Sequence, residues 1–269
     1  CNGYNTGTIT VQAGGGVAPY TYYEGGSPNS PSTSGFFNNL YDGTYNLSVR
    51  DANQCLINWN NIILTEPTEL TSTISDSSNY NNFGVHCNGD NDGWINLNVS
   101  GGVLSYNYSW TGPNGYTSSS PNLSNLEAGT YNVIVTDANS CITSETHIIT
   151  EPILLTSNVD TSNFNGFGVH CNGDTTGWIN LTVNDGVPSY SYFWTGSTTS
   201  SSQNLSNLGV GTYNVTVTDA NSCTTSETVV ITAPAVFVGG QLNASQTICY
   251  NTIPNPINTI VFPIGGSPG

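Results

Sequence analysis

Short stretches of alternating hydrophobic and polar residues run along this chain, and they predict β-strands. In the segment 129–136, Tyr131, Val133 and Val135 point to one side, and the residues between them point to the other. Matching inward sets occur in two further segments: Tyr45, Leu47, Val49 and Tyr213, Val215, Val217. The segment 94–100 shows a second alternation, with Ile95, Leu97 and Val99 on the inward side. Asp-Gly, Gly-Gly and Asn-Gly turns separate the strands, and no helical stripe stands out. The pattern predicts an all-β protein.

The strands belong to an internal repeat. The phrases GTYNLSVRDANQC, GTYNVIVTDANSC and GTYNVTVTDANSC begin at Gly43, Gly129 and Gly211. A Cys-Asn-Gly phrase recurs at Cys1, Cys87 and Cys171, and LTEP, ITEP or ITAP closes each unit. We therefore predict a first repeat at 1–67 that lacks its first strand, a second at 68–152 and a third at 153–234. Residues 235–269 would begin a different, incomplete Ig-like domain.

The repeat length indicates the architecture. A unit of this size is too long for a solenoid repeat and suits one β-sandwich domain. Trp110 and Trp194 are predicted to fill the cores, and Tyr131 resembles a tyrosine corner, in which the hydroxyl bonds back to the chain. Glu-Pro junctions at 66–67 and 151–152 leave almost no linker. We expect tandem Ig-like or fibronectin-like β-sandwich modules in a rod.

Six of the seven cysteines recur at matched spacing, one pair in each repeat. The separations are 54, 54 and 52 residues. The spacing predicts one disulfide per module, which would add roughly 4 kcal/mol to its stability on the chain-entropy model. The predicted pairs are Cys1–Cys55, Cys87–Cys141 and Cys171–Cys223. A zinc site is the alternative, but closely spaced Cys and His ligands are missing.

The composition limits the kinds of partner that the chain is expected to bind. One basic residue, Arg50, stands against 17 acids, and the formal charge is −16. Nucleic acid and anionic membrane surfaces need Lys and Arg, so neither is expected as a partner. No apolar run is long enough to span a bilayer. Persisting disulfides indicate an oxidising, extracellular setting.

The recurring phrases together resemble the SprB-type repeat of Bacteroidota surface proteins, which is associated with the mobile adhesin of gliding bacteria. The resemblance covers about 1–234, although the first repeat carries Glu24 where the others carry Trp110 and Trp194. It implies cell-surface display, export by the type IX secretion system and a role in adhesion or gliding motility. It supplies no catalytic residues.

Two acidic features could carry chemistry. Asp51, Asp137 and Asp219 could bind calcium or act as acids, but a carboxylate that caps the turn before a paired cysteine explains them better. Asn88, Asp90 and Asp92 resemble the start of a calcium loop. Since no Glu follows at the twelfth position, we favour a plain turn and keep calcium as the only candidate cofactor.

The remaining candidates are weaker. His86 and His170 precede the predicted paired cysteines and are expected to pack near the disulfides, and His147 has no counterpart. Thr175 lies in an Asp-Thr-Thr triplet that looks like a bacterial O-glycosylation motif. No Ser, His and Asp set recurs, so we predict no enzyme. Exposed aromatic residues could bind glycans, but no spacing selects a groove.

Two functions remain open from the sequence. The favoured hypothesis is a structural and adhesive segment of a long cell-surface filament, with a surface polysaccharide, another substratum ligand and neighbouring modules as partners. The alternative is a spacer, or a set of glycan-binding accessory modules, in a secreted multidomain enzyme. Cys249 has no repeat partner, so we expect the chain to continue beyond Gly269 and an upstream strand to complete the first repeat.

Overall fold

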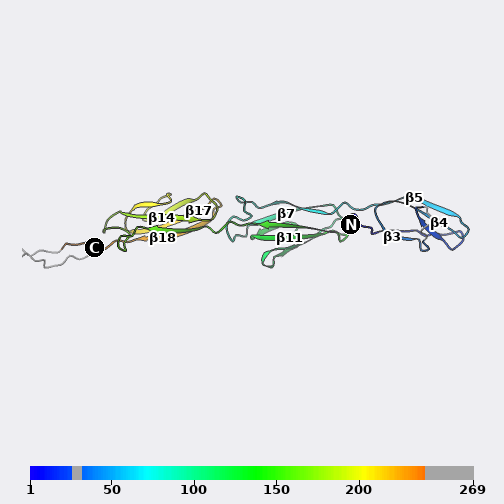
Figure 1. Ribbon diagram of the computed structural model, residues 1–269, viewed down its shortest axis with the longest axis horizontal. Helices are drawn as coiled ribbons and strands as arrows, with labels where there is room; N and C mark the ends of the chain where they lie inside the picture. Colours follow the sequence, from blue (N-terminus) through cyan, green and yellow to red (C-terminus); the bar gives the residue numbers. More distant parts are fainter. Residues whose placement is uncertain (26–31, 240–269) are drawn as a thin grey trace, which may run out of the picture. The chain divides into compact units, whose positions relative to one another are not determined.

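The computed structural model describes residues 1–25 and 32–239 (Figure 1). The described chain is built from β-strands, apart from one 3₁₀ turn, η1 (Pro113–Gly115). The described residues divide into two compact units, one of residues 1–25, 32–77, 94–125 and 129–148, the other of 78–93, 126–128 and 149–239. The prediction of an all-β protein made of tandem sandwich modules is confirmed. The predicted repeat boundaries and the rod stay predictions. No helix among the described residues is long and apolar enough to cross a membrane.

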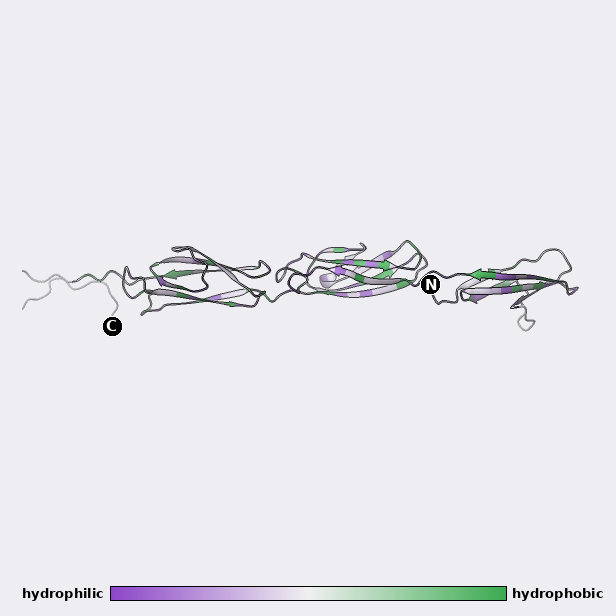
Figure 2. Cartoon of the chain, turned by 90° about the horizontal axis from the view of Figure 1, so that it is seen from above, coloured by the Kyte–Doolittle hydropathy of each residue, from purple (hydrophilic) through white to green (hydrophobic). Residues whose placement is uncertain are grey.

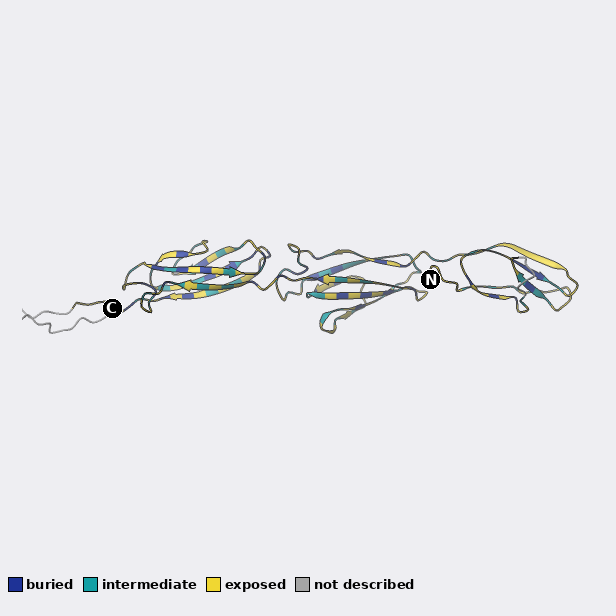
Figure 3. Ribbon diagram, viewed as in Figure 1, coloured by how far each residue is buried: buried dark blue, intermediate teal, exposed yellow. Residues whose placement is uncertain are grey.

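The first repeat contains two small antiparallel sheets. One pairs β1 (Gly7–Thr10) with β3 (Phe36–Leu40), and the other has the order β2 (Thr21–Glu24), β4 (Gly43–Arg50), β5 (Leu56–Leu64). Between them lies a core of Tyr22, Phe37, Leu40, Leu47 and Val49. Strand β5 is exposed along most of its length (Figure 3).

The second repeat has seven strands in two sheets. Their order is β10 (Leu123–Leu126), β7 (Gly93–Ser100), β6 (Thr71–Ser77) in one, and β12 (Ile142–Ile149), β11 (Gly129–Thr136), β8 (Asn107–Thr111), β9 (Thr117–Ser118) in the other. Hydrophobic and hydrophilic residues alternate along these strands (Figure 2). The predicted inward residues of β11 are buried.

The third repeat is a sandwich of two three-stranded sheets. One has the order β13 (Thr156–Thr161), β14 (Gly177–Asn184), β16 (Leu205–Leu208), and the other β15 (Ser191–Gly196), β17 (Gly211–Thr218), β18 (Thr224–Ile231). The core gathers the inward side chains of both sheets around Trp194.

Both tryptophans predicted to fill cores do so. Trp110 is 1% exposed and Trp194 is 0% exposed. Each indole N–H donates to a nearby backbone carbonyl, at 2.9 Å for Ser120 and 2.8 Å for Ser202. Burying an aromatic side chain of this size contributes about 5 kcal/mol at about 25 cal/mol per Å², and the hydrogen bond avoids leaving a buried donor unpaired.

The tyrosine-corner bond is present in the first and third repeats. The Tyr45 hydroxyl donates to the Tyr41 carbonyl and the Tyr213 hydroxyl to the Gly209 carbonyl, both at 2.9 Å. Burial raises the pKa of Tyr213, which keeps its hydroxyl protonated as the donor.

Each repeat presents its two cysteine phrases at opposite ends of the sandwich. In the third repeat, Gly177 at the start of β14 pairs with Leu208, on the side where the Cys171 phrase enters. Strand β17 starts on that side at Gly211 and ends at Thr218, just before the phrase that carries Cys223. An eight-residue strand spans about 26 Å, whereas a disulfide needs Cα atoms within about 7 Å. The two cysteines of one repeat therefore cannot meet.

Candidate functional site

The turn that ends in the second cysteine of each repeat is organised by an aspartate. We call residues 51–55, 137–141 and 219–223 the Asp turns. In the third, Asp219 Oδ1 accepts the backbone N–H groups of Asn221 and Cys223, both at 2.9 Å. Its Oδ2 accepts the Val187 N–H at 2.8 Å, which ties the turn to the loop after β14.

The same contacts recur in the other two repeats. Asp137 accepts from Cys141 and Val103, both at 2.8 Å. Asp51 accepts from Cys55 at 2.8 Å and from Val17 at 3.0 Å. The interpretation of these aspartates as turn caps is confirmed.

These hydrogen bonds set the acidity of two of the carboxyl groups. For Asp51, the N–H groups of Val17 and then Cys55 lower the pKa below its ordinary value. For Asp137, burial raises the pKa, but hydrogen bonds from Val103, Cys141 and Asn139 outweigh it and lower the pKa overall. Both groups are therefore held as carboxylates, which suits them to accept hydrogen bonds and not to donate protons at neutral pH.

A glycine makes room for each cap. Gly16, Gly102 and Gly186 have φ values of 67°, 63° and 66°. A Cβ at these positions would lie 2.9, 2.7 and 2.9 Å from an oxygen of the capping aspartate. Only glycine combines this left-handed backbone with the close approach of the carboxylate.

The first cysteine of each repeat lies in a second turn, the CNG turn, at residues 1–3, 87–89 and 171–173. This turn is held to the end of its own repeat. The Gly89 N–H donates to Glu151 at 2.7 Å, and the Asn88 side chain donates to the Pro152 carbonyl at 3.0 Å. In the first repeat Gly3 and Asn2 make equivalent bonds to Glu66 and Pro67.

In the third repeat only part of this contact remains. Asn172 donates to the Pro234 carbonyl at 3.5 Å, and Ala233 stands where the other repeats have glutamate. Sequence reasoning missed the link between the two phrases. Two features of the sequence could have revealed this link. Cys-Asn-Gly and Glu-Pro recur together in two repeats, and the third repeat lacks the glutamate.

The structure corrects the predicted disulfides. The bonds are Cys1–Cys141 and Cys87–Cys223, with Cα–Cα distances of 5.4 and 5.6 Å, and Cys55 and Cys171 are free and exposed. Each bond joins the CNG turn of one repeat to the Asp turn of the next. The prediction of one disulfide inside each module is therefore wrong. The matched spacing of 54, 54 and 52 residues reflects the period of the repeat.

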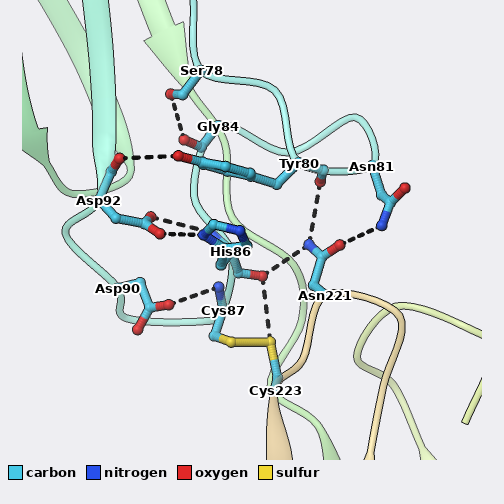
Figure 4. Close-up of polar contacts among 10 residues, drawn as sticks. All are labelled: Ser78, Tyr80, Asn81, Gly84, His86, Cys87, Asp90, Asp92, Asn221 and Cys223. Atoms are coloured by element: carbon cyan, nitrogen blue, oxygen red, sulfur yellow. Dashed lines mark hydrogen bonds and ion pairs between the residues drawn. A yellow bond between two sulfur atoms is a disulfide. The ribbon is translucent and has the colours of Figure 1, made fainter.

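Around Cys87, the CNG turn forms a platform for the next Asp turn (Figure 4). Asn221 donates to the backbone carbonyls of Tyr80 at 3.2 Å and His86 at 2.9 Å, and accepts from Asn81 at 2.5 Å. The Cys223 sulfur lies 3.3 Å from the His86 carbonyl oxygen. The asparagine of the Asp turn thus acts as a polar anchor beside the disulfide, a role that sequence reasoning also missed.

His86 adjoins the Cys87–Cys223 disulfide, as predicted, whereas His170 adjoins Cys171, which is free. The His86 ring stacks on Tyr80 with centroids 3.6 Å apart, and its Nδ1 pairs with Asp92. The His170 ring stacks on Phe164 at 3.7 Å, and its backbone N–H donates to Thr176. His147 lies elsewhere, on β12, where burial lowers its pKa.

The candidate calcium ligands do not converge. Asp90 accepts the Cys87 N–H at 3.0 Å, Asp92 pairs with His86, and Asn88 donates to Pro152. Within the ranges 1–25 and 32–239, no group of three or more His, Cys, Asp or Glu side chains could hold a metal ion. The arrangement does not fit a calcium site.

Two other predicted positions remain untested. Thr175 is exposed in the loop before β14, and its glycosylation stays a prediction. Cys249, predicted to lack a partner within the chain, lies outside the described residues.

The geometry defines a class of protein in which consecutive β-sandwich repeats are linked by disulfides. A family model described as the SprB repeat matches residues 1–23, 85–115 and 169–199. Each matched stretch contains a CNG turn. Three stretches of the chain therefore match the SprB-type repeat. No curated protein matches it.

Proposed function

We propose that this chain is a structural and adhesive segment of a long cell-surface filament, of the kind used in attachment or gliding motility. The SprB repeats support cell-surface placement. The observation that carries the proposal is the disulfide between consecutive repeats, at Cys1–Cys141 and again at Cys87–Cys223.

A bond in this position suits a tether better than a catalytic scaffold. The CNG turn is anchored to the closing Pro of its own repeat, and its cysteine is bonded to the Asp turn of the next repeat. A pulling force across the junction then acts on a covalent bond in parallel with the peptide linker. Disulfides of this kind persist outside the cell, where the environment is oxidising.

The net negative charge of the chain limits the class of ligand that we propose. With one basic residue and 17 acids, the chain repels nucleic acid and anionic lipid surfaces. A surface polysaccharide or another substratum ligand that binds through hydrogen bonds and aromatic stacking is the partner we propose. Export by the type IX secretion system of a Bacteroidota cell is part of the same proposal.

Antibody labelling of intact source cells tests the placement, with a cytoplasmic protein as the control for cell integrity. We expect labelling without permeabilisation. We also expect cells that lack the gene to attach less to a surface than cells in which it is restored. Labelling only after permeabilisation, or unchanged attachment, would refute the proposal.

A further inference from the structure

The outer face of one sheet carries a tryptophan in the second and third repeats. Trp94 on β7 precedes Ile95, and Trp178 on β14 precedes Ile179; both isoleucines are 0% exposed. Because successive side chains of a strand point to opposite faces, each tryptophan lies on the outside of its sandwich. Both tryptophans are only half-buried, so core packing does not account for them and part of each ring is open to a ligand.

Polar side chains border this tryptophan in the third repeat. The strand register places Trp178 opposite Ser206. The next outward residue of β14 is Asn180, and Asn204 lies beside this strand because its side chain accepts a hydrogen bond from the Leu181 N–H. The two asparagines and the serine are exposed. The aromatic ring is therefore bordered by two amides and a hydroxyl.

The second repeat has the same arrangement. The counterparts in its sequence are Trp94, Asn96, Asn122 and Ser124. Together with Leu123 they line a shallow hollow of about 320 Å³, a volume at the lower end of the range of about 300–1,000 Å³ that small-ligand sites show. None of these lining residues is ionisable.

One amide in each repeat is held in a fixed orientation. Asn122 Oδ1 accepts the Leu97 N–H at 3.0 Å, and Asn204 Oδ1 accepts the Leu181 N–H at 2.9 Å. Because a backbone N–H can only donate, the amide oxygen must face the strand. The NH₂ group of each exposed asparagine then remains as a donor for a ligand.

An acceptor lies beside the other amide. Asp76 pairs with Asn96 across the strands, and Asp160 pairs with Asn180. Residues directly opposite in an antiparallel pair share a face of the sheet. One oxygen of each exposed aspartate accepts the N–H of the next residue, at 2.8 and 2.9 Å, and the second oxygen remains as an acceptor. The surface thus offers donors and acceptors beside an aromatic ring.

We propose that this surface of the second and third repeats binds a neutral hexose polysaccharide. One sugar ring stacks on Trp94 or Trp178, and its hydroxyls bond to the neighbouring amides and carboxylate. A pyranose fits because its C–H groups form an apolar face, whereas each hydroxyl both donates and accepts. The inference rests on the proposed function, because it names the ligand class of the adhesive segment.

Charge favours a neutral polysaccharide over an anionic one. Each surface contains an aspartate, Asp76 or Asp160, and the whole chain has one basic residue against 17 acids. Carboxylate or sulfate groups on a sugar would therefore be repelled.

The first repeat provides a comparison within the same chain. Thr8, Thr10 and Phe36 stand there at the positions of Trp94, Asn96 and Asn122. The first repeat lacks both the outer tryptophan and the two amides, so we expect no sugar to bind at this place.

Nuclear magnetic resonance on the full chain with ¹⁵N-labelled tryptophan tests the site. The five indole N–H signals can be assigned with single Trp→Phe variants. Cellohexaose, laminarihexaose and mannohexaose serve as neutral probes, and hexagalacturonate serves as the anionic probe. We expect the signals of Trp94 and Trp178 to shift with at least one neutral probe at millimolar concentration, and the signal of Trp59 to stay in place.

The anionic probe should bind at least about tenfold more weakly than the best neutral one, since it meets an acidic chain. No shift of Trp94 and Trp178 with any neutral probe would overturn the proposal. A shift of only one of them would overturn the site in the other repeat. Equal or tighter binding of hexagalacturonate would overturn the assignment of a neutral ligand.

Variants test the stacking. W94A/W178A should raise the dissociation constant for the best probe by about tenfold or more, because it removes the aromatic contact. W94F/W178F keeps an aromatic ring and should stay within about threefold of the unmodified chain. W59A, which removes an exposed tryptophan of the first repeat, is the matched control and should change binding less than about twofold. Circular dichroism verifies that each variant is folded. Unchanged binding in W94A/W178A, or equal losses in the phenylalanine and alanine variants, would overturn the role of the rings.

The failure of this site and the failure of the proposed function give different results. If no neutral probe binds but antibody labels intact cells and attachment depends on the gene, the sugar site falls and the adhesive segment stands. Labelling only after permeabilisation would remove the proposed function and leave the resonance shifts unaffected.

Discussion

Replacing Asp219 by asparagine should open the Asp turn of the third repeat. The carboxylate accepts two N–H groups through Oδ1 and the Val187 N–H through Oδ2. An asparagine can keep its oxygen at the Oδ1 position, but its NH₂ group then faces the Val187 N–H. One charge-assisted hydrogen bond is lost, two are weakened, and a buried donor is left without an acceptor.

The cost can be worked from these contacts. A hydrogen bond to a charged group contributes about 1.5–3 kcal/mol, and an unsatisfied buried N–H costs about 1–3 kcal/mol. We therefore expect D219N to lower the free energy of local opening by about 2–4 kcal/mol, since the amide oxygen keeps part of the network. At about 1.4 kcal/mol per tenfold change, amide protection should fall by roughly 30- to 1,000-fold.

Native-state hydrogen exchange on the full chain measures this opening in peptides that cover Val187 and residues 219–223. Asp185→Asn is the matched control, because it removes the same charge from an exposed position and asparagine tolerates its φ of 59°. We expect the control to change protection by less than about twofold. A loss below about fivefold in D219N, or an equal loss in both variants, would refute the role of the carboxylate. Peptide mapping should confirm that both variants retain the Cys87–Cys223 bond.

Two further predictions concern the same turns. The folded-state pKa values of Asp51 and Asp137 lie below the ordinary value of 3.8, so the stability that these groups add is fully present above about pH 5 and is lost as the pH falls through their folded pKa values. Thermal unfolding followed by circular dichroism should show a midpoint that falls as the pH drops below about pH 4; D137N should flatten that fall, and an unchanged profile below pH 4 would contradict the assignment. Gly102→Ala should destabilise the chain by about 1–3 kcal/mol, because it adds a contact with Asp137 to the strain of a positive φ. Gly115→Ala, which has a positive φ but open space around it, should cost only the backbone term of about 1 kcal/mol in the same chemical unfolding assay; equal losses in the two variants would contradict the close contact.

The local structure of this protein could be predicted from its sequence. Alternation in the segment 129–136 identified the buried face of β11, and the turn chemistry of Asp-Ala-Asn identified the aspartate as a cap. Both are decided by neighbours a few residues away in the chain, so period and turn type carry the information. The burial of Trp110 and Trp194 follows from the same alternation.

The disulfide pairing was decided only by the tertiary structure. Each repeat has one cysteine phrase at each end of its strands, so Cys171 and Cys223 are separated by the length of the sandwich. Cys223 instead meets Cys87 of the preceding repeat, 136 residues away in the chain. The spacing of the cysteines records the period of the repeat. Which turns meet depends on the direction in which each strand runs and on how the end of one repeat is placed against the start of the next, and a periodic sequence does not specify either.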